Sequence, residues 1–354
     1  MSGKKQHFIP QSLLSGFGFQ KRDRTYVVAY TYDRGTFTPA IDGIGAERYF
    51  YSELAVDGAT ETLDDKITNY EQSFPKLLSA LRSLNDGERV DDIRAAEFVT
   101  HLAVRNDHFR KSVTAGAARL FGGMAEAFAD EGTARGMLGL IDERPSGAFA
   151  EEIAKMWGQY GSLFSLAGMS EDQFTALMFA AAKESFSSFH LEMADQISTM
   201  FDRMTDGLPS VAASSQRKSL SESLSPPLRI EKLATLEWRV DYTSSALVLP
   251  DCVSVVFDRN GDVHPTMLAD LDELETVLMP LSSNRLLVGS RRGDVVPQEL
   301  VNDAFVGCSW DFFVARDGTS ELENKRKLLR TRVFEVVDDI VAEAISEAVP
   351  GGIA

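Results

Sequence analysis

A proline-fixed bend near the start of the chain carries two side chains that could take part in chemistry. Residues 7–17 read HFIPQSLLSGF, which places His7 and Gln11 on either side of Pro10. The apolar residues that follow, among them Leu13 and Leu14, predict that the next helix is pinned to a core. A bend that holds these side chains rigidly in place suits a site in which a histidine acts as an acid or a base. It also suits a buried, hydrogen-bonded structural histidine, and we prefer that interpretation.

The segment from Arg94 to Arg110 predicts a helix with one buried face. At about 100° per residue its apolar side chains gather on one side, and these are Ala95, Phe98, Val99, Leu102, Ala103 and Phe109. We expect Glu97, His101 and His108, on the opposite side, to be solvated. Arg105 falls at the edge of the apolar face, so we expect it to be partly buried and to find a carboxylate or an anionic ligand. Pairing with a carboxylate is the interpretation that we prefer.

The elements that must position these residues predict an α+β fold. Runs of β-branched and aromatic residues predict strands at 26–32, 37–41, 237–242, 246–248, 253–257, 286–288 and 312–315. Apolar residues at helical spacing predict helices at 63–78, 91–110, 114–130, 148–157, 171–204 and 320–346. Pro75 should kink or break the first of these helices. We therefore expect mixed or antiparallel strands from the N- and C-terminal parts, with a large helical middle.

The same patterns divide the chain into five segments. We predict an N-terminal motif and hairpin at 1–58, a helical region at 59–206, a serine-rich linker or loop at 207–227, a β-rich region at 228–318 that packs with the N-terminal part, and a C-terminal helix at 319–354. The linker prediction rests on Gly207, Pro209 and the many serines that precede Pro226.

Composition limits the classes of function. The chain has 354 residues and a net charge of -17, which argues against binding nucleic acid through the whole surface. The dense basic stretch at 325–332 is interpreted as a solvated helix face. Cys252 and Cys308 lie in apolar surroundings and are expected to be free and buried. We find no apolar run of about 18 residues and no apolar signal core, so we expect a cytoplasmic protein.

Common catalytic and metal-binding motifs are absent from the sequence. We find no GxSxG, GxxxxGK[ST], GxGxxG, HExxH or CxxC pattern. His190 and Glu192 resemble the start of a zinc deaminase motif, but no PCxxC follows them. We therefore predict no metal site and assign no cofactor.

The opening segment, together with AERYFY at 46–51, resembles the bacterial family known as domain of unknown function 4238. That family opens with a similar His-x-x-Pro-x-x-x-Leu-x-x-Phe segment, followed by Glu-x-x-Phe-Tyr. The resemblance implies functional positions at Glu47, at Glu71 and Arg105 on helices, and at Asn302. MPLSSNRLLVG at 279–289 is similar to the Pro-Leu-Ser strand of the family. Where the family often has Ser-Asp-Asn-Pro, this chain retains only Asp251.

Two functions remain open at this point. If the polar side chains converge, His7, Gln11, Glu47, Arg105 and Asp251 are the candidate catalytic residues, and Arg105, Glu71 and Asn302 are the candidate binding residues. Such a site would suit a hydrolase acting on a phosphate ester, a nucleotide or a nucleic acid. If they do not converge, they fix the fold, and the chain is a non-catalytic binding, sensor or effector protein with a protein partner. We prefer the second interpretation, to which the family resemblance adds a role in phage defence.

Overall fold

The computed structural model describes residues 5–51, 62–291 and 296–348, which form two compact units. The first unit comprises Met1–Val113 and Pro209–Val336, and the second comprises Thr114–Leu208 and Val337–Ala354. The expected boundary at 58/59 lies outside the described residues. No helix in the described ranges combines the length and the apolar character that crossing a membrane requires.

Helices make up most of the described chain. The α-helices are α1 (Gln11–Leu14), α2 (Leu63–Glu71), α3 (Phe74–Ser83), α4 (Asp92–Val104), α5 (Asp107–Ala129), α6 (Glu131–Met137), α7 (Gly147–Leu166), α8 (Glu171–Glu222), α9 (Pro227–Leu233), α10 (Gln298–Gly307), α11 (Ser320–Lys325) and α12 (Thr331–Ala348). Short 3-10 helices are η1 (Ser15–Phe17), η2 (Ile41–Gly43) and η3 (Arg326–Leu328). The break expected at Pro75 is present, because α2 ends at Glu71 and Pro75 occupies the first turn of α3.

The strands come from both ends of the sequence. They are β1 (Lys5–His7), β2 (Phe19–Lys21), β3 (Arg24–Tyr26), β4 (Val28–Thr31), β5 (Gly35–Phe37), β6 (Ala46–Arg48), β7 (Glu88–Arg89), β8 (Glu237–Tyr242), β9 (Leu249–Pro250), β10 (Val255–Asp258), β11 (Val263–Pro265), β12 (Leu274–Ser282), β13 (Arg285–Ser290) and β14 (Phe312–Ala315).

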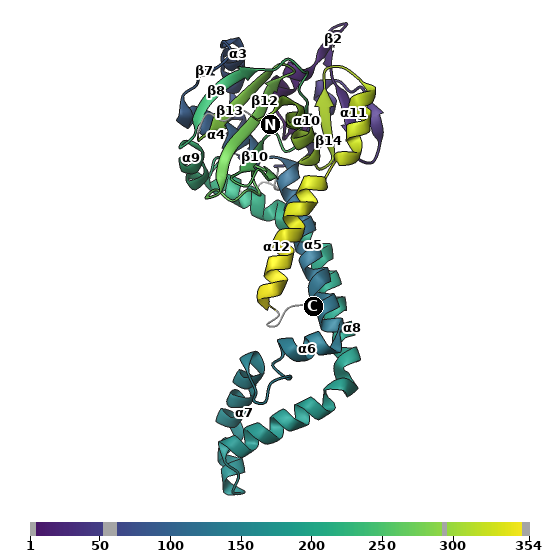
Figure 1. Ribbon diagram of the computed structural model, residues 1–354, viewed down its shortest axis with the longest axis vertical. Helices are drawn as coiled ribbons and strands as arrows, with labels where there is room; N and C mark the ends of the chain where they lie inside the picture. Colours follow the sequence, from purple (N-terminus) through teal and green to yellow (C-terminus); the bar gives the residue numbers. More distant parts are fainter. Residues whose placement is uncertain (1–4, 52–61, 292–295, 349–354) are drawn as a thin grey trace. The chain divides into compact units, whose positions relative to one another are not determined.

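Two sheets form the body of the first unit. The larger has the order β11-β10-β12-β13-β8-β7 and the smaller has the order β5-β4-β14-β9, with antiparallel neighbours throughout (Figure 1). The smaller sheet joins N-terminal β4 to C-terminal β14. This pairing and the large helical middle confirm the α+β prediction.

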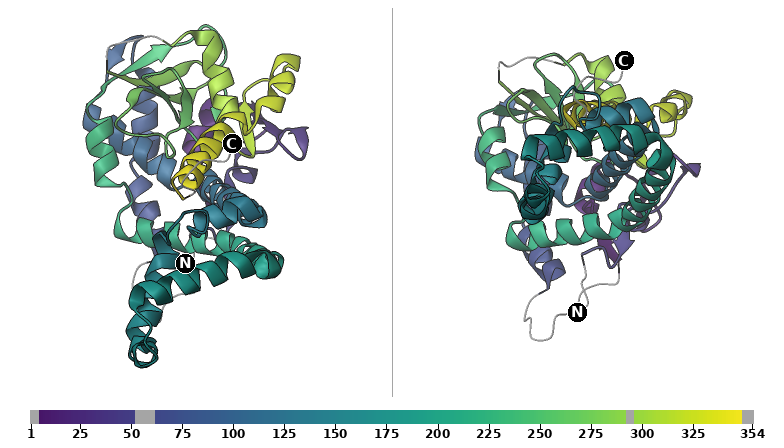
Figure 2. Two further views of the ribbon diagram at one scale, coloured as in Figure 1. Left: turned by 60° about the horizontal axis from the view of Figure 1, so that its bottom comes forward. Right: turned by 90° about the horizontal axis from the view of Figure 1, so that it is seen from below.

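Helix α4 is the central helix of the first unit. It packs against α9 and β8 (Figures 1 and 2), and it is buried continuously from Phe98 to Val104. A helix that is covered on every side buries its polar residues together with its apolar ones. The expectation that His101 and His108 are solvated is therefore wrong: His101 is 0% exposed and His108, in the first turn of α5, is 3% exposed.

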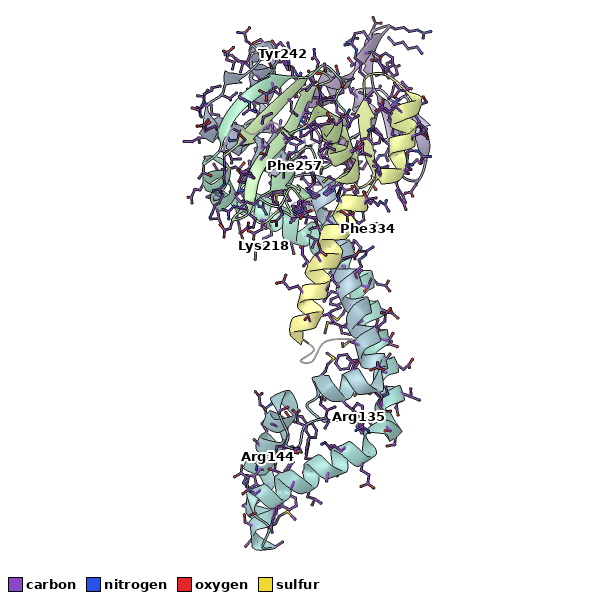
Figure 3. The ribbon with its side chains drawn as sticks, in the orientation of Figure 1. Arg135, Arg144, Lys218, Tyr242, Phe257 and Phe334 are labelled. Atoms are coloured by element: carbon purple, nitrogen blue, oxygen red, sulfur yellow. The ribbon has the colours of Figure 1, made fainter. Side chains whose placement is uncertain are left out.

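The second unit has a small core of its own. Its buried residues are Ala134, Leu140, Ile153, Phe174, Phe179 and Phe186. Arg135, which is labelled in Figure 3, lies over the Phe186 ring and donates to the Ser187 hydroxyl at 2.9 Å. A cation over an aromatic face adds to the apolar packing of such a core.

The serine-rich stretch at 207–227, predicted to be a linker or loop, is helical as far as Glu222. Gln216 explains part of this difference. It is 3% exposed and its amide donates to Val104 O at 2.7 Å and to Asn106 O at 3.0 Å. Because serine is only a moderately poor helix former, such tertiary hydrogen bonds decide the structure. Within residues 207–227, the chain is non-helical only in the short segment between α8 and α9.

The helix expected at 320–346 is interrupted within its basic stretch. Arg330 has a positive φ of 72°, which separates η3 from α12. Its side chain is 17% exposed and donates from Nε to Trp310 O at 2.8 Å. Arg330 is therefore part of the fold, and the basic stretch is not one solvated helix face. The expectation for Cys252 and Cys308 is confirmed, since both are free and buried.

Candidate functional site

The N-terminal bend places His7 and Gln11 next to each other. Gln11 Nε2 donates to His7 Nε2 at 3.0 Å. Burial lowers the pKa of His7 to about 4, and the nearby charges of Lys5 and Arg105 act in the same direction. The imidazole is therefore neutral at physiological pH and can accept a proton only in more acidic solution.

Arg105 is buried against this bend. It is 1% exposed, and its guanidinium donates to the carbonyl oxygens of His7 and Phe8, the latter at 3.2 Å from Nε. Its Nη1 forms an ion pair with Glu71 Oε1. Burial lowers the pKa of Arg105. The carboxylate partner expected for a buried arginine is thus Glu71, at the end of α2.

His101 completes a buried network with Glu71 and Arg105. Its Nε2 lies 2.7 Å from Glu71 Oε1 and its Nδ1 lies 2.8 Å from Leu224 O. Burial lowers the pKa of His101 to about 4, but both ring nitrogens face oxygen acceptors. Because a neutral imidazole has a single N–H, it can donate to only one of these two oxygens, either Glu71 Oε1 or Leu224 O. The network joins α2, α4 and the segment between α8 and α9.

Asp251 and Asn302 bind backbone groups. The Asp251 carboxylate accepts from three consecutive backbone N–H groups, which belong to residues 310–312. Asn302 accepts from Val248 N at 3.1 Å and donates to Ala246 O at 2.8 Å. Both side chains therefore hold neighbouring loops in place.

Glu47 lies at an open pocket of about 400 Å³ in the first unit. The pocket is lined by Phe8, Thr31, Asp33, Arg34, Phe37, Gly43, Ile44, Gly45, Ala46, Glu47, Asp107, Lys111, Asp311 and Phe312. Its polar side chains come from β6, from the turn between β4 and β5, from the first turn of α5 and from the residue before β14. Segments that are far apart in the sequence therefore meet here.

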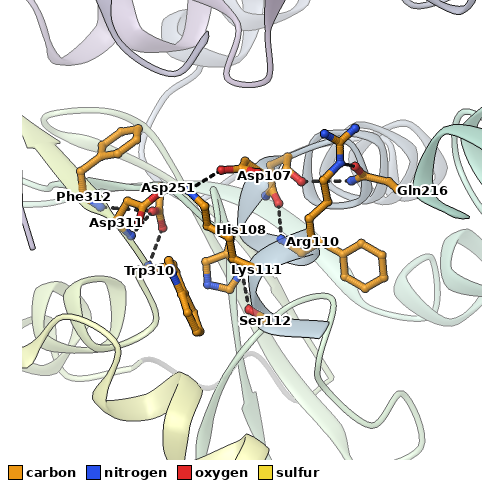
Figure 4. A network of polar contacts seen from close by, with 12 residues as sticks. Asp107, His108, Arg110, Lys111, Ser112, Gln216, Asp251, Trp310, Asp311 and Phe312 are labelled. Atoms are coloured by element: carbon orange, nitrogen blue, oxygen red, sulfur yellow. Dashed lines mark hydrogen bonds and ion pairs between the residues drawn. The ribbon is translucent and has the colours of Figure 1, made fainter. Parts of the chain in front are cut away.

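Lys111 is neutralised inside this pocket. Its Nζ lies 2.6 Å from Asp107 Oδ2 and also contacts Asp311 Oδ2 (Figure 4). Burial opposes its charge, but the two carboxylates prevail and raise the pKa of Lys111. Burial also raises the pKa of Glu47, and the charge of Asp107 adds to this effect. The Glu47 side chain forms no hydrogen bond or ion pair with another residue in the described part of the chain.

The seven candidate residues thus fall into separate groups. Glu71 and Arg105 are in contact, and Arg105 reaches His7 through a backbone carbonyl. Glu47 is in the open pocket, and Asp251 is buried behind the pocket residues Asp311 and Phe312. Within the described ranges, no three His, Cys, Asp or Glu side chains are arranged to hold a metal ion.

Sequence reasoning missed Asp107, Lys111 and Asp311. The spacing of four between Asp107 and Lys111 in a helix was a usable signal for an ion pair. No local pattern indicated that Asp311, which is 200 residues from Lys111, would join them.

Fold and site together define an α+β protein with a buried polar network and an open pocket rich in carboxylates. The family comparison makes the assignment more specific. The chain belongs to the family described as "Protein of unknown function (DUF4238)", whose pattern matches residues 5–305. Searches of curated proteins and of solved structures gave no match.

Proposed function

We propose that the chain is a non-catalytic binding protein that holds a cationic group of a partner protein in the pocket beside Glu47. The observation that carries this proposal is the composition of the pocket. Four carboxylates, those of Asp33, Glu47, Asp107 and Asp311, share it with Lys111 and Arg34. Two of the carboxylates already neutralise Lys111. Glu47 is therefore placed to attract a further positive charge.

The apolar lining suits the stem of a long basic side chain. Phe8, Phe37, Ile44 and Phe312 line the same pocket. A lysine or arginine side chain can lay its methylene groups on such surface while its charged end meets a carboxylate. The net charge of -17 favours the approach of a basic partner over long range. A lysine-rich segment of a protein fits these properties.

The hydrolase alternative lacks a comparable observation. His101 and Arg105, the groups suited to proton transfer and anion binding, are 0% and 1% exposed. Their hydrogen-bonding groups face Glu71 and backbone carbonyls. A substrate would have to displace these partners to reach them. The role in phage defence stays a prediction of the family resemblance.

The test is a titration of the protein with a fluorescent lysine-rich peptide. Glu47→Gln removes one charge from an exposed side chain, so the fold should persist. We expect this variant to bind the peptide about five-fold more weakly, roughly 1 kcal/mol, because it loses one charge contact. Fluorescence anisotropy measures the affinity, and added salt should weaken the wild-type complex.

Two controls separate a pocket from general charge attraction. Glu231→Gln makes the same change of net charge on an exposed position of α9 and should leave the affinity unchanged. A peptide of the same length with acetylated lysines should not bind. Equal losses in the Glu47 and Glu231 variants, or equal binding of the acetylated peptide, would contradict the proposal.

A further inference from the structure

Another open pocket of the first unit is formed by helices α2, α3 and α4. It has a volume of about 480 Å³, which is within the range of about 300–1,000 Å³ that small-molecule sites occupy. The residues that line it are Tyr70, Ser73, Phe74, Lys76, Leu77, Ala80, Arg94, Glu97 and Phe98. None of them lines the pocket beside Glu47, so the two pockets are separate.

The floor of this pocket is aromatic and is held in place by packing. The rings of Phe74 and Phe98 lie 5.0 Å apart, edge to face, and Tyr70 packs against Phe74 at 5.8 Å. Phe74 and Phe98 are 6% and 2% exposed. Tyr70 and Phe74 also pack on His101, which belongs to the buried polar network. The floor is therefore preformed, and it can receive an apolar group of a ligand without rearrangement.

Glu97 supplies a negative charge to the pocket. Its Oε1 accepts from the Tyr70 hydroxyl, whose pKa is raised to about 12 by burial and by this hydrogen bond. Tyr70 therefore stays protonated and keeps the carboxylate oriented. Among the residues that the structure describes, Glu97 Oε2 has no hydrogen-bond or ion-pair partner. This oxygen can therefore receive a positively charged group of a ligand.

Lys76 and Arg94 supply two positive charges. Both side chains are exposed and line the pocket from different helices, α3 and α4. Neither forms an ion pair or a side-chain hydrogen bond with another residue in the described ranges. Arg94 precedes Glu97 by three residues, so the two are neighbours on α4, with Cβ atoms about 5–6 Å apart. The pocket thus presents a carboxylate and a guanidinium side by side, and the two are not paired with each other.

We propose that this pocket binds a free α-amino acid with a large apolar side chain. The ammonium and the carboxylate of such a molecule are attached to one carbon atom, so they are close enough together to meet Glu97 and Arg94 at the same time. Lys76 adds a second cation for the carboxylate. The apolar side chain of the ligand lies on Phe74 and Phe98, where its burial contributes to affinity.

Ligands that lack one of these three groups match the pocket less well. A fatty acid would leave Glu97 without a cation and would bring a second negative charge close to it. An amine without a carboxylate would leave Lys76 and Arg94 without an anion. An amino acid with a charged side chain would place that charge over the aromatic floor, away from water. The combination of charges and floor therefore favours an apolar amino acid.

Isothermal titration calorimetry of the full-length protein with L-phenylalanine tests the ligand, and the result does not depend on the pocket beside Glu47. Two analogues each lack one charge: 3-phenylpropionate has no ammonium, and phenethylamine has no carboxylate. We expect L-phenylalanine to bind and each analogue to bind about ten-fold more weakly, because each loses one charged contact. If L-phenylalanine does not bind up to its solubility limit, or if either analogue binds as tightly, the proposal is wrong.

Two variants assign the ends of the ligand. Glu97→Gln keeps an acceptor for the Tyr70 hydroxyl and should bind L-phenylalanine about ten-fold more weakly, with no loss of affinity for 3-phenylpropionate. Arg94→Gln should weaken the binding of L-phenylalanine and of 3-phenylpropionate, but not that of phenethylamine. A partial loss of folded protein cannot produce these opposite selectivities, because it would affect all three ligands equally.

Matched controls come from exposed positions elsewhere in the first unit. Glu231→Gln and Arg316→Gln make the same changes of charge outside the pocket and should bind L-phenylalanine as the wild type does. Equal losses for all three ligands in the Glu97 and Arg94 variants, or losses in the two control variants as large as those at the pocket, would overturn the proposal.

Discussion

The Arg105→Met variant is expected to lose about 3–5 kcal/mol of the free energy of unfolding of the first unit. Methionine keeps much of the side-chain volume but removes the charge and all the donors. The substitution leaves Glu71 without its buried cation and leaves the carbonyl oxygens of His7 and Phe8 without the guanidinium. An unpaired buried charge and unsatisfied carbonyls both disfavour the folded state.

Tryptophan fluorescence during urea unfolding can follow the first unit specifically. The three tryptophans are Trp157 in the second unit and Trp238 and Trp310 in the first. A Trp157→Phe background therefore confines the signal to the first unit. In this background, Arg94→Met is the matched control, because Arg94 is an exposed arginine on the same helix. A loss no larger for Arg105→Met than for Arg94→Met would show that the buried ion pair adds little.

The double variant Glu71→Gln/Arg105→Met separates the ion pair from the backbone contacts. Glu71→Gln removes the buried negative charge, so the double variant should lose less stability than the sum of the two single variants. Simple additivity would mean that Glu71 and Arg105 are not coupled. The same experiment bears on function, because a side chain held for catalysis often costs little stability when it is removed.

Local sequence patterns predicted much of the fold. They failed where the burial or the secondary structure of a residue depends on partners that are distant in the sequence. The strand at 237–242 was predicted with the observed bounds of β8, because alternation is encoded within the strand itself. The helical wheel around His101 failed, since it assumes one buried face and the part of α4 from Phe98 to Val104 is buried on all sides. The serines after Pro209 were misread because Gln216 obtains its partners from the segment around Val104.

The candidate site likewise has one part that the sequence predicts and one part that it does not. The pairing of a buried Arg105 with a carboxylate could be predicted, because elementary electrostatics demands a partner for a buried charge. The pocket beside Glu47 could not be predicted, because Asp107, Lys111 and Asp311 meet only once β14 has docked against β4. Side chains that define an open site therefore depend on topology, which a single sequence reveals least.

The Asp251→Ala variant is expected to lose about 2–4 kcal/mol of stability, because it leaves three backbone N–H donors, two of them fully buried, without an acceptor. Asp251 Oδ1 accepts from Trp310 N at 2.8 Å, and Oδ2 accepts from Asp311 N at 2.6 Å and from Phe312 N at 3.1 Å (Figure 4). Since Asp311 and Phe312 line the pocket, the variant should also bind the lysine-rich peptide more weakly. Asp251→Asn keeps one acceptor oxygen and should be the milder substitution. If Asp251→Ala unfolds at the wild-type urea concentration, these hydrogen bonds do not hold β14 in place.

The pH dependence of stability tests the same carboxylate independently. Burial, with a contribution from Asp311, raises the pKa of Asp251 from 3.8 to about 7, although the three N–H donors oppose this shift. The folded protein therefore binds a proton more tightly than the unfolded chain does. The stability that this proton contributes is fully present below pH 3.8 and is lost as the pH rises to about 7. The amide of Asp251→Asn does not titrate. As the pH rises from 3.8 to about 7, the wild type should therefore lose stability relative to this variant, and above about pH 7 the difference between the two should stay constant. A difference that stays constant between pH 4 and pH 8 would mean that the three N–H donors outweigh burial and keep Asp251 ionised throughout.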